Sequence, residues 1–397
     1  MSKNKKLSRL IPKNHFCSLG LFRDQPLIVW RYTKAVLFTA YDVYRSNDYW
    51  LDKTINSGKT LKEGLIDLGF PKTNTLVADT GVFEMEAKKA GIARNLGIDV
   101  DIELTNEQIF EAYSLSGADY FVAPDEIVLP EDDQTVVLTK IEKIKDNLLE
   151  LLEVVPASKV IAVIQGHEED TITDLYDFYR EHEISCFAIG GLIPLYHHSK
   201  EKLEKVLTFV RNLTQDYWLH IFGLPRMSLL QYYLHKIGVD SVDTSALLYL
   251  TARRRYLVGS KGEQVRTVDF KKCSCKGCSN LDPIPSPRSP EFFVNLYIHN
   301  ILAAVRLAVA SSFNLDLIGE KESNNGRQEK RAIRRKMDST SEEMIRSDSI
   351  QSIWMTAEES LALSKKKKEQ EPAKDSHYNL SELLHPNKIN PKSEDDH

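Results

Sequence analysis

The chain has 397 residues, 42% of them hydrophobic, and a formal net charge of −5 at pH 7. This length allows one large domain or two ordinary ones, and the small acidic charge excludes a chain that is basic throughout, so any site for a polyanion must be local. Five cysteines are typical of a reducing compartment, and we expect a cytoplasmic protein rather than a secreted disulfide scaffold.

The N-terminal segment predicts no secretory signal, because the basic stretch "MSKNKKLSRLIPK" is not followed by an apolar core. No run in the chain reaches the roughly 18 apolar residues that a membrane span requires. We therefore expect no membrane partner.

Short apolar runs alternate with longer amphipathic segments over the following part of the chain. The predicted strands cover residues 26–30, 35–41, 75–79, 119–124, 159–166, 185–191, 217–223 and 239–245. Helical periodicity covers residues 105–117, 133–155, 168–183 and 199–215, and the first of these opens with the capping-box pair Thr105 and Gln108. Alternation of this kind predicts a parallel α/β fold, and about eight strands fit a (β/α)8 TIM barrel. A doubly wound open sheet is the alternative, although no G-x-G-x-x-G follows the first strand.

Small or polar residues follow six predicted strands at their carboxyl ends. They are Asp79-Thr80-Gly81, Pro124-Asp125-Glu126, Gln165-Gly166, Gly190-Gly191, Gly223 and Asp243-Thr244. In a parallel barrel these ends lie on one face, where active sites are built. The alternative is that these clusters have no shared function, since loops are generally polar and glycine-rich. That explanation accounts for any one cluster but less well for six in succession.

Three cysteines stand close together in "FKKCSCKGCSN", at Cys273, Cys275 and Cys278. They could be part of a disulfide framework, a chance grouping, or three ligands of a metal. A thiolate zinc site usually takes four ligands, so the fourth must come from another segment. Residues 291–313 predict an amphipathic helix that carries His299. We expect His299 to complete a closed, structural Cys3His zinc site, and a helical histidine without a metal is the alternative.

Charge is unevenly distributed around this cluster. Residues 251–280 carry eight Lys or Arg and two Asp or Glu, whereas the chain from residue 319 onward is charged, Ser-rich and poor in aromatic residues, which is typical of disorder. The predicted organisation is an N-terminal segment (1–25), a catalytic barrel (26–262), a zinc-binding subdomain with its packing helix (263–318) and a largely disordered tail (319–397).

Six segments between about residues 75 and 310 resemble, in order, the motifs of the tRNA-guanine transglycosylases. "DTGVFE" is similar to D-S-G-G-F-Q, "APDE" to F-D-E, "VIQG" to V-Q-G, and "AIGGLIPL" to the G-G-L segment. "GVDSVDTSA" resembles the segment G-x-D-x-F-D-[CS] that carries the nucleophile, and C-x-C-x-x-C with a helical His-Asn resembles the zinc site of the family.

The resemblance implies that a guanine in a polynucleotide is exchanged for a 7-deazaguanine base. Asp243 matches the nucleophile that holds the sugar covalently, and Asp79 matches the carboxylate that manages the proton of the base. The base would be recognised by Asp125, Gln165, Gly190, Gly191 and Leu192. Phosphates would be held by Arg253, Arg254 and Arg255.

Each assignment has a structural alternative. Asp79 could cap a helix, and Asp125 could pair with a neighbouring Lys or Arg. Asp240 could be the family carboxylate in place of Asp243. The three arginines could be the solvated face of a helix.

Departures from the family pattern bear on the substrate. Tyr196 stands where the bacterial tRNA enzymes carry Glu, which implies a base other than the aminomethyl form, and 7-cyano-7-deazaguanine is expected. Val82 and Glu84 replace Gly and Gln of the family motif, and residues 319–397 do not resemble the C-terminal RNA-binding domain of the archaeal enzymes. This profile resembles DpdA, the DNA-modifying branch, so DNA is the expected substrate. A tRNA-guanine transglycosylase of the queuosine or archaeosine type and a non-catalytic partner subunit are the alternatives. The expected protein partners are a second copy of the chain or other proteins of a modification system.

Overall fold

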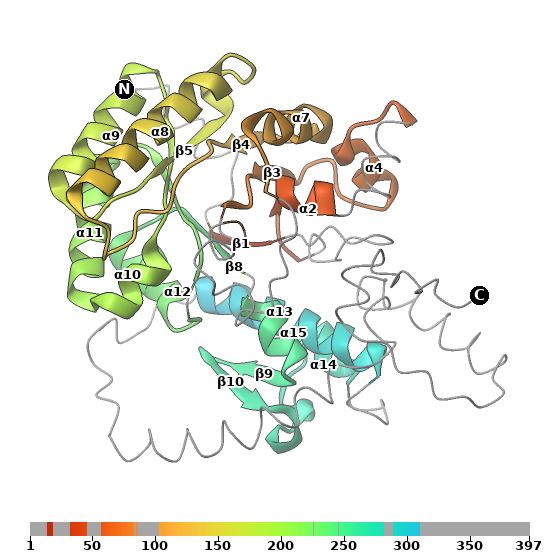
Figure 1. Cartoon of the computed structure of the whole chain (residues 1–397). Helices are drawn as coiled ribbons and strands as arrows, with labels where there is room; N and C mark the ends of the chain where they lie inside the picture. The colour runs from red at the N-terminus through yellow and green to blue at the C-terminus, as the bar shows by residue number, and fades with distance from the viewer. Residues whose placement is uncertain are drawn as a thin grey trace, which may run out of the picture.

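A closed barrel of eight parallel strands forms the centre of the computed structural model, and each strand pairs with the next in chain order until β8 pairs with β1 (Figure 1). The structure describes residues 14–18, 32–45, 57–82, 85, 103–224, 226–244, 246–281 and 289–309. The strands are β1 (Asn14–Ser18), β2 (Ala35–Thr39), β3 (Thr75–Asp79), β4 (Tyr120–Val122), β5 (Val160–Ile164), β6 (Cys186–Ile189), β7 (Trp218–Ile221) and β8 (Ser241–Thr244). The barrel prediction is confirmed, and the open sheet is excluded by the β1–β8 pairing.

Seven of the eight predicted strands are present, and the first strand differs. The candidate at 26–30 lies outside the described residues, and β1 instead comes from Asn14–Ser18, upstream of the predicted start of the barrel at residue 26. It pairs with both β2 and β8, for example Cys17 with Val36 and Asn14 with Ser241. The sequence "NHFCS" has neither an apolar run nor a clear alternation, so its strand conformation depends on partners that are distant in the chain.

Helices cover the outside of the barrel. They are α2 (Ala40–Arg45), α4 (Leu61–Asp67), α7 (Asn106–Ser116), α8 (Gln134–Leu152), α9 (Glu169–Glu181), α10 (Leu192–His198), α11 (Lys200–Leu213), α12 (Leu229–Gln231) and a π-helical segment (Tyr232–Ile237). A 3-10 turn (Ala157–Lys159) precedes β5. The capping box predicted for α7 is confirmed, since Thr105 accepts from the Gln108 backbone and Gln108 accepts from the Thr105 backbone.

The core has two layers, because the strands are buried on both sides, as parallel strands usually are. One cluster fills the barrel interior and includes Leu37, Val77, Val163 and Trp218. A larger cluster lies between the strands and the surrounding helices. The interior is therefore a packed core, and ligands can enter only at its rim.

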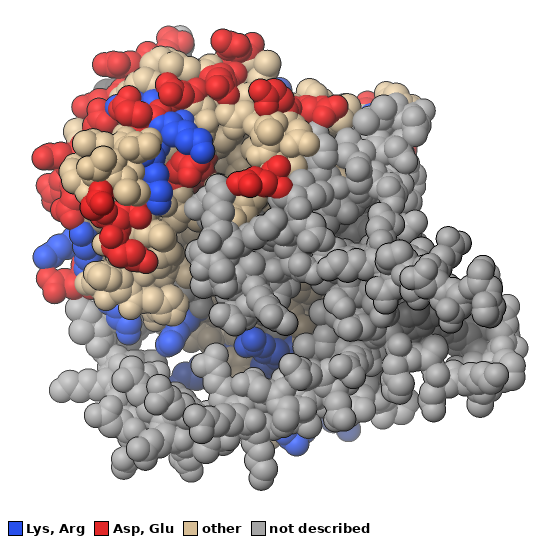
Figure 2. All heavy atoms as spheres, in the orientation of Figure 1, with Lys and Arg blue, Asp and Glu red and all other residues tan. Residues whose placement is uncertain are grey.

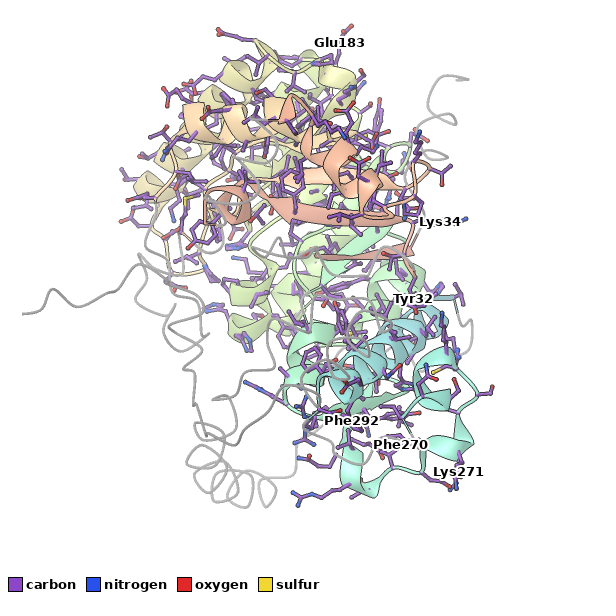
Figure 3. The ribbon with its side chains drawn as sticks, turned by 90° about the vertical axis from the view of Figure 1, so that its right-hand side faces the viewer. Tyr32, Lys34, Glu183, Phe270, Lys271 and Phe292 are labelled. Atoms are coloured by element: carbon purple, nitrogen blue, oxygen red, sulfur yellow. The ribbon has the colours of Figure 1, made fainter. Side chains whose placement is uncertain are left out.

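A smaller C-terminal unit packs beside the barrel. It contains α13 (Ala246–Ala252), the antiparallel pair β9 (Arg255–Val258) and β10 (Lys261–Gln264), 3-10 turns at Val265–Thr267 and Phe270–Lys272, α14 (Lys276–Ser279) and α15 (Pro290–Val309). Figure 3 shows Phe270 and Phe292 in this unit, where their rings meet edge to face at 6.0 Å.

Helix α15 is apolar for a reason that the fold supplies. Within the described part of the chain, Glu291–Val309 is the one helical segment long and apolar enough to cross a membrane, but 72% of it is buried inside the protein. It contacts α13, α14 and β9, so its apolar side chains are accounted for by packing. The tail predicted at 319–397 lies outside the described residues.

Candidate functional site

The six polar clusters lie at one rim of the barrel, because all eight strands run parallel and each cluster follows its strand. Side chains from β3, β4, β5, β6, β7 and β8 are thereby brought together, although they come from residues 79 to 244 of the sequence. This rim is the face on which barrel enzymes place their catalytic groups.

A buried amide–carboxylate pair links β4 and β5 at this rim. Nε2 of Gln165 donates to Oδ2 of Asp125 at 2.6 Å, and the two residues are only 1% and 7% exposed. Oε1 of Gln165 accepts from the backbone N–H of Val128 at 3.3 Å. Glu126, the neighbour of Asp125, pairs with Lys143 of α8. The Gln165 amide is thus fixed in orientation by contacts at both of its ends.

The glycines after β6 give Gln165 the space that it occupies. A Cβ at Gly190 would lie 2.1 Å from Nε2 of Gln165, and a Cβ at Gly191 would lie 2.9 Å from its Oε1. Gly191 also has a φ of +67°, which disfavours other residues. Leu192, the first residue of α10, is 1% exposed beside them. Four of the predicted base-binding residues therefore form one contiguous group with Asp125.

A cavity of about 110 Å³ opens beside Asp125. Its walls come from the ends of β3 and β4 and from α7 and α8, and they are Thr80, Val82, Met85, Glu103, Leu104, Asn106, Ile109, Pro124, Asp125, Glu126, Lys143 and Asn147. Polar and charged side chains make up more than half of these walls, so the cavity suits a small polar molecule.

Asp79 is the last residue of β3 and lies close to this group. The next residue, Thr80, accepts with its hydroxyl from the Val82 backbone at 3.2 Å. The pKa of Tyr113 is raised well above the ordinary value by burial, and further by the charges of Asp79 and Asp125. Its hydroxyl donates to the Val122 carbonyl at 2.8 Å, so Tyr113 is a neutral group beside both acids.

Asp243 lies within β8, and its side chain is 14% exposed. Oδ1 accepts from the backbone N–H of Gly223 at 2.7 Å. Asp240, the alternative carboxylate, precedes β8 and so lies toward the opposite end of the barrel, where it pairs with Arg211 at 3.2 Å and accepts from the Leu219 backbone at 3.0 Å. Asp240 therefore has a structural role, and Asp243 is the acid at the rim.

Gly223 joins Asp243 to the base-binding group. A Cβ at Gly223 would lie 2.9 Å from Cδ1 of Ile193, which follows Leu192 in α10, and its φ is +72°. Contacts thus run without interruption from Asp125 through Gln165 and α10 to Gly223 and Asp243.

The three arginines lie away from any helix face. Arg253 and Arg254 follow the end of α13, and Arg255 opens β9. Arg254 has a φ of +53° and lies 5.6 Å from the centre of the Phe293 ring. The helix-face alternative is therefore wrong. On the face seen in Figure 2, acidic side chains gather over the region of α8, α9 and α11 with some basic ones among them, and further basic side chains lie nearer the C-terminal unit.

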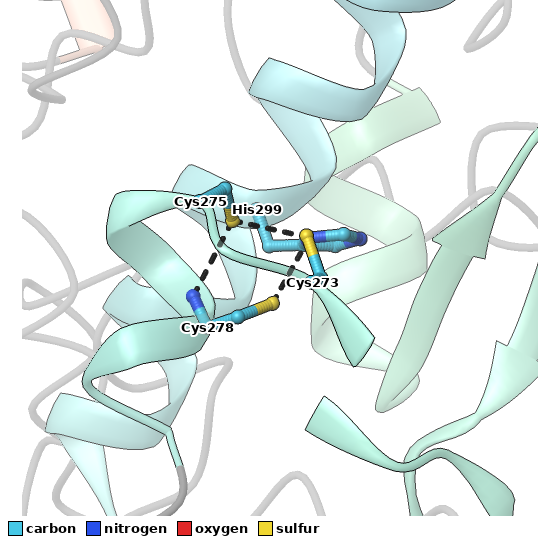
Figure 4. A group of neighbouring side chains, drawn as sticks. All are labelled: Cys273, Cys275, Cys278 and His299. Atoms are coloured by element: carbon cyan, nitrogen blue, oxygen red, sulfur yellow. Dashed lines mark hydrogen bonds between the residues drawn. The ribbon is translucent and has the colours of Figure 1, made fainter. Parts of the chain in front are cut away.

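Cys273, Cys275, Cys278 and His299 converge, with their ligand atoms all within 4.8 Å of one another (Figure 4). Nδ1 of His299 lies 3.7, 3.4 and 3.2 Å from the sulfur atoms of Cys273, Cys275 and Cys278. Tetrahedral zinc with ordinary bond lengths separates nitrogen and sulfur ligands by about 3.6 Å. The set fits a closed zinc site and can hold the ion without an open position.

Surrounding groups orient these ligands. Nε2 of His299 donates to the Leu257 carbonyl at 3.0 Å, which leaves Nδ1 as the metal-binding atom. Burial lowers the pKa of His299, which favours the neutral ring that a metal requires. The Tyr256 ring stacks on the imidazole at 3.6 Å, and its hydroxyl lies 3.1 Å from Sγ of Cys278. Asn300 is fully buried and binds the backbone of β9, which joins α15 to the antiparallel pair of the C-terminal unit.

Some residues around these sites were not predicted from the sequence. His220 stands inside the apolar run "WLHIF", and a single polar residue in a buried strand is a signal that could have identified it. Tyr256 carries no such signal, because its partners His299 and Cys278 come from distant segments.

Comparisons with known proteins agree with this geometry. The family model described as Queuine tRNA-ribosyltransferase matches residues 44–308. A tRNA-guanine(15) transglycosylase of Pyrococcus abyssi is 23% identical over 269 residues, which are 66% of this chain and 43% of that protein. The protein of the same name from Archaeoglobus fulgidus is 24% identical over 258 residues, 63% of this chain and 48% of that protein. The chain thus spans less than half the length of these curated relatives.

Proposed function

Because the chain belongs to the Queuine tRNA-ribosyltransferase family, we propose that it is a guanine transglycosylase, a pentosyltransferase that exchanges a guanine of a nucleic acid for a free 7-deazaguanine base. The observation that carries this proposal is the continuous group at the barrel rim. It joins a polar base-binding pair, Asp125 and Gln165, to an acid suited to attack a sugar, Asp243.

Asp243 is assigned the role of nucleophile. In the first step a carboxylate oxygen bonds to C1′ of the sugar, the bond from C1′ to N9 of guanine breaks, and guanine leaves with the electron pair and takes up a proton. In the second step N9 of the incoming base bonds to C1′, the aspartyl ester breaks, and the base loses its N9 proton. Two displacements at one carbon restore the original configuration, as in retaining glycosidases.

Asp79 is assigned the transfer of protons to the departing guanine and from the incoming base. One proton is taken up by the departing guanine and one is released by the incoming base, so a single carboxyl group at the rim can deliver the first and receive the second. Tyr113 feels the charge of both Asp79 and Asp125, which supports the placement of Asp79 near the base rather than in an unrelated loop.

Asp125 is assigned recognition of the base. A carboxylate accepts hydrogen bonds only, so it suits the Watson–Crick N–H groups of guanine and of a 7-deazaguanine alike. Asp125 lines the cavity, and the hydrogen bond from Gln165 fixes its orientation. The reacting nucleotide must leave its stack to reach such a cavity.

The polymer we propose is tRNA, in place of the DNA expected from the sequence. The curated relatives are named tRNA-guanine(15) transglycosylases, which favours the tRNA alternative. The DNA expectation relied on the departures at Val82 and Glu84 and on residues 319–397, which lie outside the described residues, and the chain spans less than half of those relatives. The resemblance to DpdA therefore remains a prediction, and 7-cyano-7-deazaguanine remains the expected base.

The remaining assignments follow from this activity. Arg253, Arg254 and Arg255 belong to the segment 251–280 with its excess of six positive charges and are proposed to contact phosphates. Zinc at the Cys3His set is proposed to hold the C-terminal unit in shape. A cytoplasmic location, a homodimer and other modification proteins as partners stay predictions.

The test is a base-exchange assay with labelled guanine and labelled 7-cyano-7-deazaguanine, each offered with bulk tRNA, duplex DNA and single-stranded DNA. We expect label to enter tRNA, and to be lost with Asp243→Ala but not with Asp146→Ala, a substitution at an exposed acid of α8. Label in DNA alone would restore the DNA reading, and label in neither polymer would contradict the enzymatic function.

A further inference from the structure

A buried histidine lies directly behind Asp243. His220 is in β7 and is 1% exposed, and its Nε2 lies 3.5 Å from Oδ1 of Asp243. This separation is longer than an ordinary hydrogen bond, but such contacts at catalytic groups often tighten when the substrate binds. The histidine takes no part in the chemistry described above, and a polar ring in a packed barrel interior needs a reason.

Ser241 and Asp243 together favour one position for the proton of the imidazole ring. Oγ of Ser241 lies 2.7 Å from Nδ1 of His220, and Ser241 is fully buried. If the hydroxyl donates to Nδ1, the proton of the neutral ring is on Nε2 and points to Asp243. The reverse arrangement would set a lone pair of Nε2 against a carboxylate, which is repulsive. The neighbouring carboxylate therefore favours the tautomer with Nε2–H.

Aromatic neighbours hold the imidazole plane. The Trp218 ring stacks on His220 at 5.7 Å and 10°, and the Phe222 ring meets it edge-on at 4.7 Å. Burial lowers the pKa of His220, and the charge of Asp243 opposes that shift. A neutral ring can donate one hydrogen bond without cancelling the negative charge that a nucleophile needs.

Both contacts to Asp243 fall on the same oxygen. The N–H of Gly223 and Nε2 of His220 both reach Oδ1, and Oδ2 receives neither of them. We propose that His220 is a positioning residue for Asp243: with its tautomer set by Ser241, it holds Oδ1 so that Oδ2 is presented to C1′ of the sugar. This assignment rests on the proposed function and adds to it the pair that orients the nucleophile.

Four variants separate positioning from packing. In His220→Gln the amide nitrogen falls near the place of Nε2 and can still donate to Asp243, whereas in His220→Asn it falls near Nδ1 and cannot. His220→Phe keeps a ring and removes both nitrogens. Ser241→Ala leaves the ring in place and removes only the group that sets the tautomer.

We expect His220→Phe and His220→Asn to lower kcat by about 10–100-fold, with KM for the base within about twofold of wild type. His220→Gln should recover most of that loss, and Ser241→Ala should lower kcat by about 3–10-fold. The double variant Ser241→Ala, His220→Phe should be no slower than His220→Phe alone, because Ser241 acts through His220. The amount of covalent protein–nucleic acid intermediate should fall most in His220→Phe and His220→Asn, and less in Ser241→Ala and His220→Gln.

The matched control is Thr214→Val, which removes another fully buried hydroxyl, at the end of α11, and should leave kcat unchanged. An unchanged kcat in both His220→Phe and Ser241→Ala would overturn the assignment, as would losses that add up in the double variant. If His220→Phe fails to fold, the comparison of the Gln and Asn variants decides in its place. If Asp243→Ala abolishes exchange but the His220 variants keep wild-type kcat, the role assigned to His220 is wrong and the proposed function stands. If the wild-type protein shows no exchange, the proposed function is wrong as well.

Discussion

Nε2 of Gln165 donates a 2.6 Å hydrogen bond to Oδ2 of Asp125, and both residues are buried at the rim of the barrel. A carboxylate that is held in this way cannot rotate freely, and it lines the cavity that we assign to the base. Geometry of this kind is preorganised, because the cost of orienting the acceptor is met on folding rather than on binding.

Asp125→Asn should therefore weaken binding of the base. The substitution preserves shape but replaces a charged acceptor with an amide, and hydrogen bonds to charged groups contribute about 1.5–3 kcal/mol. We expect KM for the free base to rise by about 10–100-fold, measured by steady-state exchange with the base concentration varied. Asp146→Asn, at an exposed position of α8, is the control, and an unaltered KM in Asp125→Asn would remove Asp125 from the base site.

Gly190→Ala should disable the site without a change of charge. The added Cβ would lie 2.1 Å from Nε2 of Gln165, so the amide must move and its bond to Asp125 must break. We expect a loss of at least about tenfold in kcat/KM together with a lower Tm. Gly64→Ala is the matched control, since its Cβ meets nothing within 4 Å in helix α4, and it should raise stability by about 0.5–1 kcal/mol. Equal activities in the two variants would contradict the packing argument.

The barrel could be predicted from the sequence because its signals are local. Strands β2 to β7 are short apolar runs, β3 to β8 are followed by polar clusters, and the start of α7 is set by Thr105 and Gln108, which are three residues apart in the chain. Strand β1 could not be predicted, since Asn14–Ser18 becomes a strand only by pairing with β2 and β8. What can be recognised in one segment depends on whether its partners are close in sequence.

The same distinction applies to the candidate site. The acids and glycines at the rim follow their strands and could be recognised one by one, and the zinc ligands could be predicted from cysteine spacing. The choice between Asp240 and Asp243 could not be made from residue type, because it depends on which end of β8 each occupies and on the pairing of Asp240 with Arg211. The contact of His220 with Asp243 depends on the register of β7 against β8.

Cys275→Ser should reduce the metal content of the protein. Removing one thiolate from a closed four-ligand set leaves an incomplete coordination shell, and structural zinc contributes directly to folding. We expect about one zinc per wild-type chain and well below that in the variant, measured by mass spectrometry of the metal, together with a lower Tm. The control is Ser274→Ala, because Ser274 is exposed and lies between the ligands Cys273 and Cys275. This variant should keep its full zinc content. A Cys275→Ser protein with full zinc would contradict the Cys3His set.

Asn300→Ala should destabilise the C-terminal unit, because the partners of its side chain lie in α13 and β9 of the same unit. The side chain of Asn300 accepts from the Leu257 N–H at 2.9 Å and donates to Oγ1 of Thr251 at 2.9 Å and to the Arg255 carbonyl at 3.0 Å. Its removal leaves buried partners unsatisfied at about 1–3 kcal/mol each, and these losses are not fully additive. We expect the free energy of unfolding to fall by about 3 kcal/mol in urea titrations, against a change within about 0.5 kcal/mol for the exposed Asn280→Ala. Similar urea midpoints for the two variants would show that Asn300 does not stabilise the C-terminal unit.

His167 should make stability depend on pH below neutrality. It follows β5, and burial, with a smaller effect of Lys202, lowers its pKa from 6.5 to about 4. As the pH falls, the unfolded chain takes up this proton before the folded protein does, so the unfolded state is favoured. The free energy of unfolding is therefore unaffected by His167 above about pH 6.5 and falls progressively as the pH is lowered from there to about pH 4.

His167→Gln removes this proton uptake. We therefore expect the variant to lose less free energy of unfolding than wild type between pH 7.5 and pH 5, with about one proton fewer bound on unfolding at pH 5. Urea titrations across this range measure the difference, and the interval from pH 7.5 to pH 8.5 is the internal control, because the curves of the two proteins should run parallel there. Curves that stay parallel down to pH 5 would show that His167 titrates alike in the folded and unfolded chains.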